Sequence, residues 1–291
     1  MQQCTLCLEI PSHEESSFAL TWPLNKRVGV RLYPDCSPHY LETASLQKGL
    51  VLILDNHELI EEGMGFGAPV VKYKNKTYFS STAKLSMETT EKHIIWTKSF
   101  AVDTVSRKRF GKGSYVNDRF YRFFHKVFET LYLGISGLFP FFDKIMELRG
   151  VMKLQTVFVR VKSKGKITVA YFIKPDEINV QVDLSKLDKE GCENVLLLNE
   201  QGASFFKEYS DSNGERIHTF HIGAWEKVHA FAASLSILQG SLKFLLQHQP
   251  QSEMYRGWEK TRTRFDWAGL SYSLSPQTRF FDYSIKLTGF N

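Results

Sequence analysis

Alternation of apolar and polar residues with a period of two constrains this chain more than any other feature of its sequence. Clear examples are the segments 28–33 (VGVRLY), 156–162 (TVFVRVK) and 166–173. A period of two turns one side of an extended strand toward a core and the other toward water, whereas apolar residues of a helix recur every three or four positions. Turn residues separate the segments, and Asn213-Gly214 predicts a two-residue type I′ hairpin turn because both positions adopt positive φ at little cost.

The pattern predicts a mainly β protein, a large antiparallel β-sandwich or supersandwich. The 291 residues suffice for one such unit, since single all-β domains of roughly 250 residues are common. Apolar residues make up 43% of the chain and charged residues 23%, which excludes a disordered or fibrous protein. No repeat of fixed period and no long linker divides the sequence, so we predict one β-rich domain over 1–291. The expected strands are 4–10, 18–22, 28–33, 70–73, 77–80, 93–100, 156–162, 166–173, 178–184, 195–198, 216–222, 227–238, 241–247, 258–265, 270–274 and 278–287.

One segment departs from this pattern and has helical spacing. After Asn117, a favourable N-cap, the apolar residues Phe120, Phe124 and Val127 fall on one face of a helix. A second short helix is expected over 141–148. The sequence therefore predicts a central helical hairpin, inserted at about 117–149, that either covers the open end of the sandwich or forms a Phe-rich lid or interfacial helix.

The ends and the cysteines indicate no secreted or membrane-spanning protein. The N-terminal sequence has no basic leader and no long apolar stretch, so we expect a cytoplasmic location. The longest mostly apolar stretch, 130–142, is shorter than the roughly 20 residues that a membrane-spanning helix needs. No transmembrane segment is therefore expected, and the four cysteines are expected to stay reduced rather than to form a disulfide framework. The sequence does not indicate an oligomeric state.

Two motifs of the sequence bear on metal or phosphate binding. Cys4 with Cys7 and Cys36 with His39 form two short pairs of the ligands that zinc prefers. An extended strand would place the first two cysteines on opposite faces, so ordinary thiols are favoured and no metal or cofactor is expected. The glycine-rich segment 63–69 leads into a strand rather than a helix, which excludes a phosphate-binding loop and favours close approach of two backbones or of a ligand.

The segment from Trp258 to Trp267 carries the strongest functional signal. Read as a strand, it places an indole and three cations on one face, where guanidinium groups could bind oxyanions and the indole could stack on a sugar ring. The alternative is a solvated face whose cations pair with acids of a neighbouring strand. The predicted ligand-binding residues are Trp258, Lys260, Arg262, Arg264, Trp225 and Trp267.

His218 and His221 are the candidate catalytic residues. Both belong to the expected strand 216–222, and a histidine titrates near neutral pH, which suits a general acid or base. Taken alone, each is more often a surface histidine or a satisfied core histidine than a catalytic one. Whether the chain is an enzyme is left open by the sequence.

The length, the β content and the aromatic and basic strand YRGWEKTRTRFDW (255–267) together resemble the β-supersandwich of galactose-mutarotase-like and polysaccharide-processing proteins. The resemblance implies a sugar ligand. The catalytic His and Glu motifs of that family are not matched, so no catalytic residue is carried over.

Three functions follow from these features. The first is binding of, or activity on, a sugar or an anionic oligosaccharide. The second is a lipid or apolar-ligand carrier with the Phe-rich helical hairpin as its lid. The third is nucleic-acid binding through the basic cluster within 105–126. Nucleic acid is not expected as a partner, because stacking rings and base-reading side chains are not gathered there.

Overall fold

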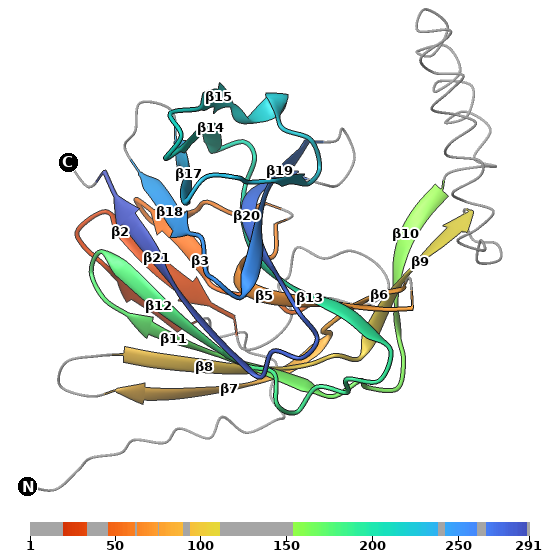
Figure 1. Ribbon diagram of the computed structural model, residues 1–291. Helices are drawn as coiled ribbons and strands as arrows, with labels where there is room; N and C mark the ends of the chain where they lie inside the picture. Colours follow the sequence, from red (N-terminus) through yellow and green to blue (C-terminus); the bar gives the residue numbers. More distant parts are fainter. Residues whose placement is uncertain are drawn as a thin grey trace, which may run out of the picture.

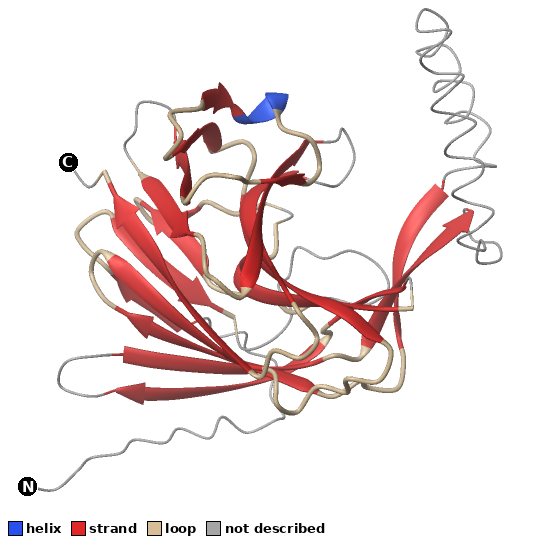
Figure 2. Cartoon of the chain, viewed as in Figure 1, coloured by secondary structure: helices blue, strands red, loops and turns tan. Residues whose placement is uncertain are grey.

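The computed structural model describes residues 20–33, 46–61, 63–74, 76–89, 94–110, 154–237, 242–260 and 266–289. Within these ranges the chain forms three sheets, of four, eight and nine strands (Figure 1). Neighbouring strands pair antiparallel, as in β11 with β12 and β13 with β20. Strands dominate the described chain, and one 3-10 turn, η1 (Thr219–His221), interrupts them (Figure 2). The prediction of a mainly β, antiparallel protein is confirmed.

The smallest sheet has the order β1-β2-β3-β4. Residues Asp55 and Asn56 connect its last two strands, and both have positive φ, at 50° and 65°. This is the backbone geometry of a type I′ turn, which matches the twist of the two flanking strands. The strands are β1 (Leu20–Pro23), β2 (Val28–Leu32), β3 (Val51–Leu54) and β4 (His57–Glu58).

The eight-stranded sheet combines strands from both halves of the chain. Its centre is β13 between β5 and β20, which brings residues 65–73 beside residues 192–201. In order across the sheet, the strands are β10 (Leu154–Arg160), β9 (Thr104–Phe110), β6 (Lys76–Phe79), β5 (Gly65–Tyr73), β13 (Cys192–Gln201), β20 (Asp266–Leu274), β19 (Ser252–Lys260) and β16 (Glu226–Lys227).

The nine-stranded sheet carries the site described below. Its central strand is β21, the last strand of the chain, which lies between β18 and β12. In order across the sheet, the strands are β15 (Arg216–His218), β14 (Phe206–Asp211), β17 (Ala232–Ile237), β18 (Lys243–Gln247), β21 (Phe280–Thr288), β12 (Glu177–Asp183), β11 (Lys166–Ile173), β8 (Ile94–Ala101) and β7 (Thr82–Thr89).

The two large sheets pack face to face over one apolar cluster, as a sandwich requires. Along β11, every second residue from Ile167 to Ile173 is buried, so the alternation seen in the sequence is the alternation of burial. Hydrogen bonds of tyrosine hydroxyls cross between the sheets, among them that of Tyr272 to the Gln247 carbonyl at 2.5 Å. The Tyr171 hydroxyl donates to the Phe66 carbonyl at 2.8 Å, and the Tyr283 hydroxyl donates to Asn199 Oδ1 at 2.7 Å. These bonds satisfy polar atoms that the packing buries.

The glycine-rich segment passes close to another part of the backbone, as predicted. Gly65 and Gly67 have φ of 77° and 73°, a region that side chains with a Cβ rarely adopt. A Cβ on Gly65 would lie 2.9 Å from the carbonyl carbon of Gly49. Leu50 and Phe66 exchange two backbone hydrogen bonds at this contact, of 2.9 and 2.7 Å. The glycines therefore join the segment before β3 to the start of β5.

Several local predictions need correction. Four residues, 212–215, separate β14 from β15, so Asn213-Gly214 does not form a two-residue turn. The Asp211 carboxylate accepts from the amides of Asn213 and Glu215 at 2.9 and 3.2 Å, which stabilises the wider loop, and only Gly214 has positive φ. The expected strand 227–238 consists of β16, a loop and β17.

The predicted helical hairpin is not borne out. No α-helix occurs in the ranges that the structure describes, and 117–149 lies outside them. No helix among the described residues has both the length and the apolar character to cross a membrane.

Candidate functional site

The outer face of the nine-stranded sheet is polar where β12 and β21 run side by side. Antiparallel pairing sets Asn179 opposite Ser284 and Gln181 opposite Asp282, while the alternate residues Val180 and Tyr283 face the core. Paired residues of an antiparallel sheet project on the same face, with Cβ atoms about 5 Å apart. Two segments remote in sequence therefore build one continuous row of hydrogen-bonding side chains.

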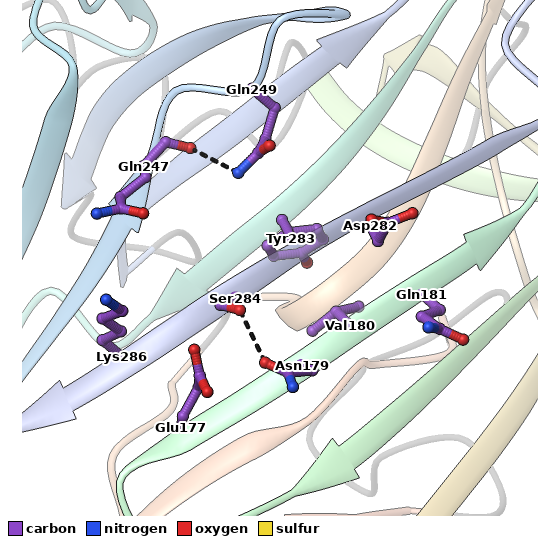
Figure 3. Close-up of a pocket in the computed structure, with 10 residues that line it drawn as sticks. All are labelled: Glu177, Asn179, Val180, Gln181, Gln247, Gln249, Asp282, Tyr283, Ser284 and Lys286. Carbon is purple, nitrogen blue, oxygen red and sulfur yellow. Dashed lines mark hydrogen bonds between the residues drawn. The ribbon is translucent and has the colours of Figure 1, made fainter.

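A depression of about 440 Å³ lies on this face (Figure 3). In the figure, Gln181 and Asp282 project side by side at one end, and Lys286 lies at the other. Asn179 and Ser284 occupy the middle and bond to one another at 2.7 Å. The lining residues come from β12, β18, β21 and the turn after β18. They are Glu177, Asn179, Val180, Gln181, Gln247, Gln249, Asp282, Tyr283, Ser284 and Lys286.

Several of these side chains have hydrogen-bonding capacity that the protein leaves unused. Gln181, Asp282 and Lys286 are exposed, and none of their side chains bonds to another residue in the described part of the chain. Together they offer an amide, a carboxylate and an ammonium group, which covers both donors and acceptors. All three project from strands rather than loops, so their positions are set by the sheet.

A second depression, of about 300 Å³, continues the first across β12 and β11. The two share Gln181 and Asp282 in their linings. The phenyl ring of Phe280 borders the second depression and is 65% exposed. We call the two depressions together the sheet groove. The second is lined by Thr168, Ala170, Gln181, Val182, Asp183, Phe280, Phe281 and Asp282.

The charge of the sheet groove is predominantly negative. Its carboxylates are those of Glu177, Asp183 and Asp282, and its ammonium group is that of Lys286. Glu177 pairs with Lys174 at 3.6 Å, whereas Asp183 and Asp282 form no ion pair with any described residue. An anionic ligand would be repelled by these two carboxylates. Lys189 acts electrostatically on Asp183 but does not line the groove.

The structure places part of the predicted binding segment differently from the sequence analysis. β19 ends at Lys260, and Trp267 belongs to the next strand, β20. The ammonium group of Lys260 donates to Ser204 Oγ at 2.7 Å and lies 3.8 Å from the Asp266 carboxylate, so this cation already has acidic and polar partners. Arg262 and Arg264 lie outside the described residues.

The predicted tryptophans partly gather at the end of the eight-stranded sheet. The rings of Trp225 and Trp267 stack with centroids 4.7 Å apart, and Trp225 is 38% exposed. Trp258 packs against the main core instead, and its amide donates to the Gly223 carbonyl at 3.1 Å. These residues do not line the sheet groove, and their role as a binding site remains a prediction.

His218 and His221 do not lie on one strand, because β15 ends at His218 and His221 is the last residue of the η1 turn. His218 Nδ1 accepts from the Phe220 amide at 3.3 Å and so caps η1. Burial, with the positive charge of Lys207 and the neighbouring His221, holds the pKa of His218 below its usual value. Neither histidine hydrogen-bonds a carboxylate in the described part of the chain. A catalytic role for them also remains a prediction.

Sequence analysis missed the sheet groove. The segments EINVQVD and FFDYSIK show that Gln181 and Asp282 are exposed positions of strands, but not that the two strands are neighbours. The four candidate zinc ligands, Cys4, Cys7, Cys36 and His39, lie outside the described residues. Within the described ranges, no group of three or more His, Cys, Asp or Glu side chains could hold a metal ion.

Comparison with known proteins gives one kind of similarity. No family model matches the chain, and no curated protein matches it. Among solved structures, the chain is similar to one described as a "Putative aldose 1-epimerase" from Escherichia coli K12, with 8% sequence identity and a TM-score of 0.35. The match covers 93% of this chain and 99% of that one. At this TM-score and identity it transfers no residue role and no function.

Proposed function

We propose that this protein binds carbohydrate in the sheet groove. The observation that carries the proposal is the set of unused hydrogen-bonding groups on rigid strands, bordered by the exposed ring of Phe280. A sugar presents adjacent hydroxyls that both donate and accept, and its ring carries C–H groups that pack on an aromatic face. The amide of Gln181 can donate and accept, the carboxylate of Asp282 can accept twice, and Lys286 can donate.

An apolar ligand fits this groove poorly. Binding a lipid there would bury Gln181, Asp282 and Lys286 without partners, and each buried polar group left without a hydrogen bond costs about 1–3 kcal/mol. The Phe-rich lid of the lipid-carrier hypothesis falls on 117–149, outside the described residues. The groove therefore supports a sugar rather than a lipid.

The charge distribution favours a neutral sugar. The expectation of an anionic oligosaccharide rested on the cations of 258–264, and the described member of that set, Lys260, lies beside Asp266. The sheet groove instead contains the unpaired carboxylates of Asp183 and Asp282. We therefore propose neutral saccharides as ligands.

Removal of the two groups shared by both depressions should abolish most of the binding. Isothermal titration with glucose, galactose and their neutral oligosaccharides is expected to show saturable binding, which weakens about tenfold or more in the double variant Gln181→Ala/Asp282→Ala. Two lost hydrogen bonds of about 1 kcal/mol each predict an effect of this size. Both side chains are exposed and make no bond to other described residues, so the variant should fold normally, as circular dichroism can verify.

Asp176→Ala is the matched control for this experiment, because Asp176 is an exposed acid in the turn before β12 that does not line the groove. Absence of binding by any neutral sugar would contradict the proposal. So would equal loss of affinity in the control and the double variant.

The stacked pair of Trp225 and Trp267, which we call the tryptophan cluster, is retained as a second proposed contact for sugar. Tryptophan fluorescence separates the two sites, because no tryptophan lines the sheet groove whereas Trp225 is exposed in a stacked pair. Calorimetric binding without fluorescence quenching supports the groove alone. Quenching that disappears in Trp225→Ala would support the cluster. His218 and His221 are kept as the candidate proton carriers.

A further inference from the structure

We infer that the sheet groove holds a neutral oligosaccharide of at least two sugar rings, with one ring stacked on Phe280. This inference rests on the proposed carbohydrate binding and names the class of ligand. It starts from the continuity of the groove, since Gln181 and Asp282 line both depressions. A ligand bound by these two side chains extends into either depression without leaving the groove.

The dimensions of the groove exceed the need of a single ring. Pockets for small molecules begin at roughly 300 Å³. The first depression, of about 440 Å³, and the second, of about 300 Å³, each reach that size. They lie side by side along β12 and β21, so consecutive rings of a chain could occupy them in turn.

The second depression has the composition of a stacking subsite. Phe280 pairs with Asp183 across β21 and β12, and Asp183 pairs with Thr168 across β12 and β11, so the three form one row on the outer face. In the next row, Ala170 pairs with Gln181, and its small side chain leaves space in the second depression. Phe280, which is 65% exposed at the edge of this hollow, supplies an aromatic ring on which a flat partner can pack.

The charges beside Phe280 select against acidic sugars. Asp183 and Asp282 both line the second depression, and no lysine or arginine does. A uronic acid at this subsite would place its carboxylate near two others, with no cationic side chain among the residues that line the second depression. The ring stacked on Phe280 is therefore a neutral sugar.

The test measures how the affinity for a saccharide depends on its number of rings, in three proteins. Glucose, cellobiose and cellotriose, and galactose with its β-1,4-linked di- and trisaccharides, are titrated into the full chain, Phe280→Ala and Phe280→Trp. We expect the trisaccharide of one series to bind at least tenfold more tightly than its monosaccharide. Phe280→Ala should abolish this gain, and Phe280→Trp should retain it. Phe231→Ala, which truncates another exposed phenyl ring that lines neither depression, should match the native protein.

The outcomes separate this inference from the proposed function. Equal affinity for mono- and trisaccharide, or a gain that persists in Phe280→Ala, overturns the second subsite and leaves carbohydrate binding standing. Failure of every sugar to bind overturns both. A trimer of galacturonic acid should bind at least tenfold more weakly than the neutral β-1,4-linked galactose trisaccharide, and equal binding would overturn the selection for neutral rings.

Discussion

Ionisation of Glu200 is expected to lower the free energy of unfolding of the native protein by about 3 kcal/mol as the pH rises from 4.5 to about 7, and Glu200→Gln should lack this decrease. Glu200 is 5% exposed and lies on β13 between Gly65 of β5 and Gly269 of β20. Its carboxylate accepts from the Met64 amide at 2.9 Å. Burial raises the pKa of Glu200 from 4.5 to about 7, although the Met64 amide and the charge of Lys48 oppose the rise.

The direction of the pH effect follows from this raised pKa. Between pH 4.5 and 7 the folded protein holds the proton on Glu200 while the unfolded chain releases it, so the free energy of unfolding falls as the pH rises. The stabilisation is complete below pH 4.5 and is lost by the time the pH exceeds 7. A glutamine accepts the Met64 hydrogen bond without ionising, so the variant lacks this contribution to the pH dependence.

Urea unfolding of the native protein and Glu200→Gln at several values between pH 4.5 and 8 measures the effect. The difference between the two proteins isolates Glu200 from all other titrating groups, and it should change in favour of the variant with rising pH. The exposed acid Glu190 provides the control, because Glu190→Gln should leave the pH profile parallel to the native one. A parallel profile for Glu200→Gln would show that residue 200 does not hold its proton on folding.

Gly49→Ala is expected to destabilise the protein by about 3 kcal/mol or more, because the added methyl group clashes with backbone atoms whose positions are fixed by hydrogen bonds. A Cβ at this position would lie 2.0 Å from the Phe66 carbonyl oxygen and 2.7 Å from its carbon. The neighbouring backbone is held by the hydrogen bond from the Gly49 amide to the Met64 carbonyl, of 2.8 Å, and by the paired bonds of Leu50 and Phe66. Relief of the clash would break the junction between the segment before β3 and the start of β5.

The unfolding midpoint in urea measures this loss. Gly223→Ala is the control, since its Cβ would approach only the flexible side chain of Glu226, at 3.0 Å from Oε1. We expect the control to lose far less stability than Gly49→Ala. Similar midpoints for the two variants would refute the explanation by backbone contact.

Features that depend on neighbours in sequence were predicted well. The strand expected over 166–173 coincides with β11, because the burial of its residues alternates with the period that the sequence displays. The glycine-rich approach to β5 was also recognised, since few residues other than glycine permit such a contact. The hairpin turn at Asn213 was wrong because the carboxylate of Asp211, two residues earlier, bonds the loop amides and favours a longer loop.

Whether a predicted residue is available to bind a ligand depends on contacts with residues that are remote in sequence. The cation of Lys260 could be assigned to an exposed face, but whether it remained available was decided by Ser204 and Asp266. His218 could be assigned to a strand, yet the strand ends there and the imidazole caps the following turn. In each case, a local pattern reports the direction of a side chain and not the group that it meets.

By itself, the sequence determined that the chain forms antiparallel strands with one apolar and one polar side, because a period of two is a local property that a few residues suffice to express. Only the tertiary structure decided which strands are neighbours, and so which polar side chains lie next to one another on the sheet. The pairing of residues 177–183 with 280–286 joins strands about a hundred positions apart and creates the groove around Gln181 and Asp282. Alternation specifies a face of each strand, whereas a binding site requires the order of the strands, and that order is set by packing over the whole core.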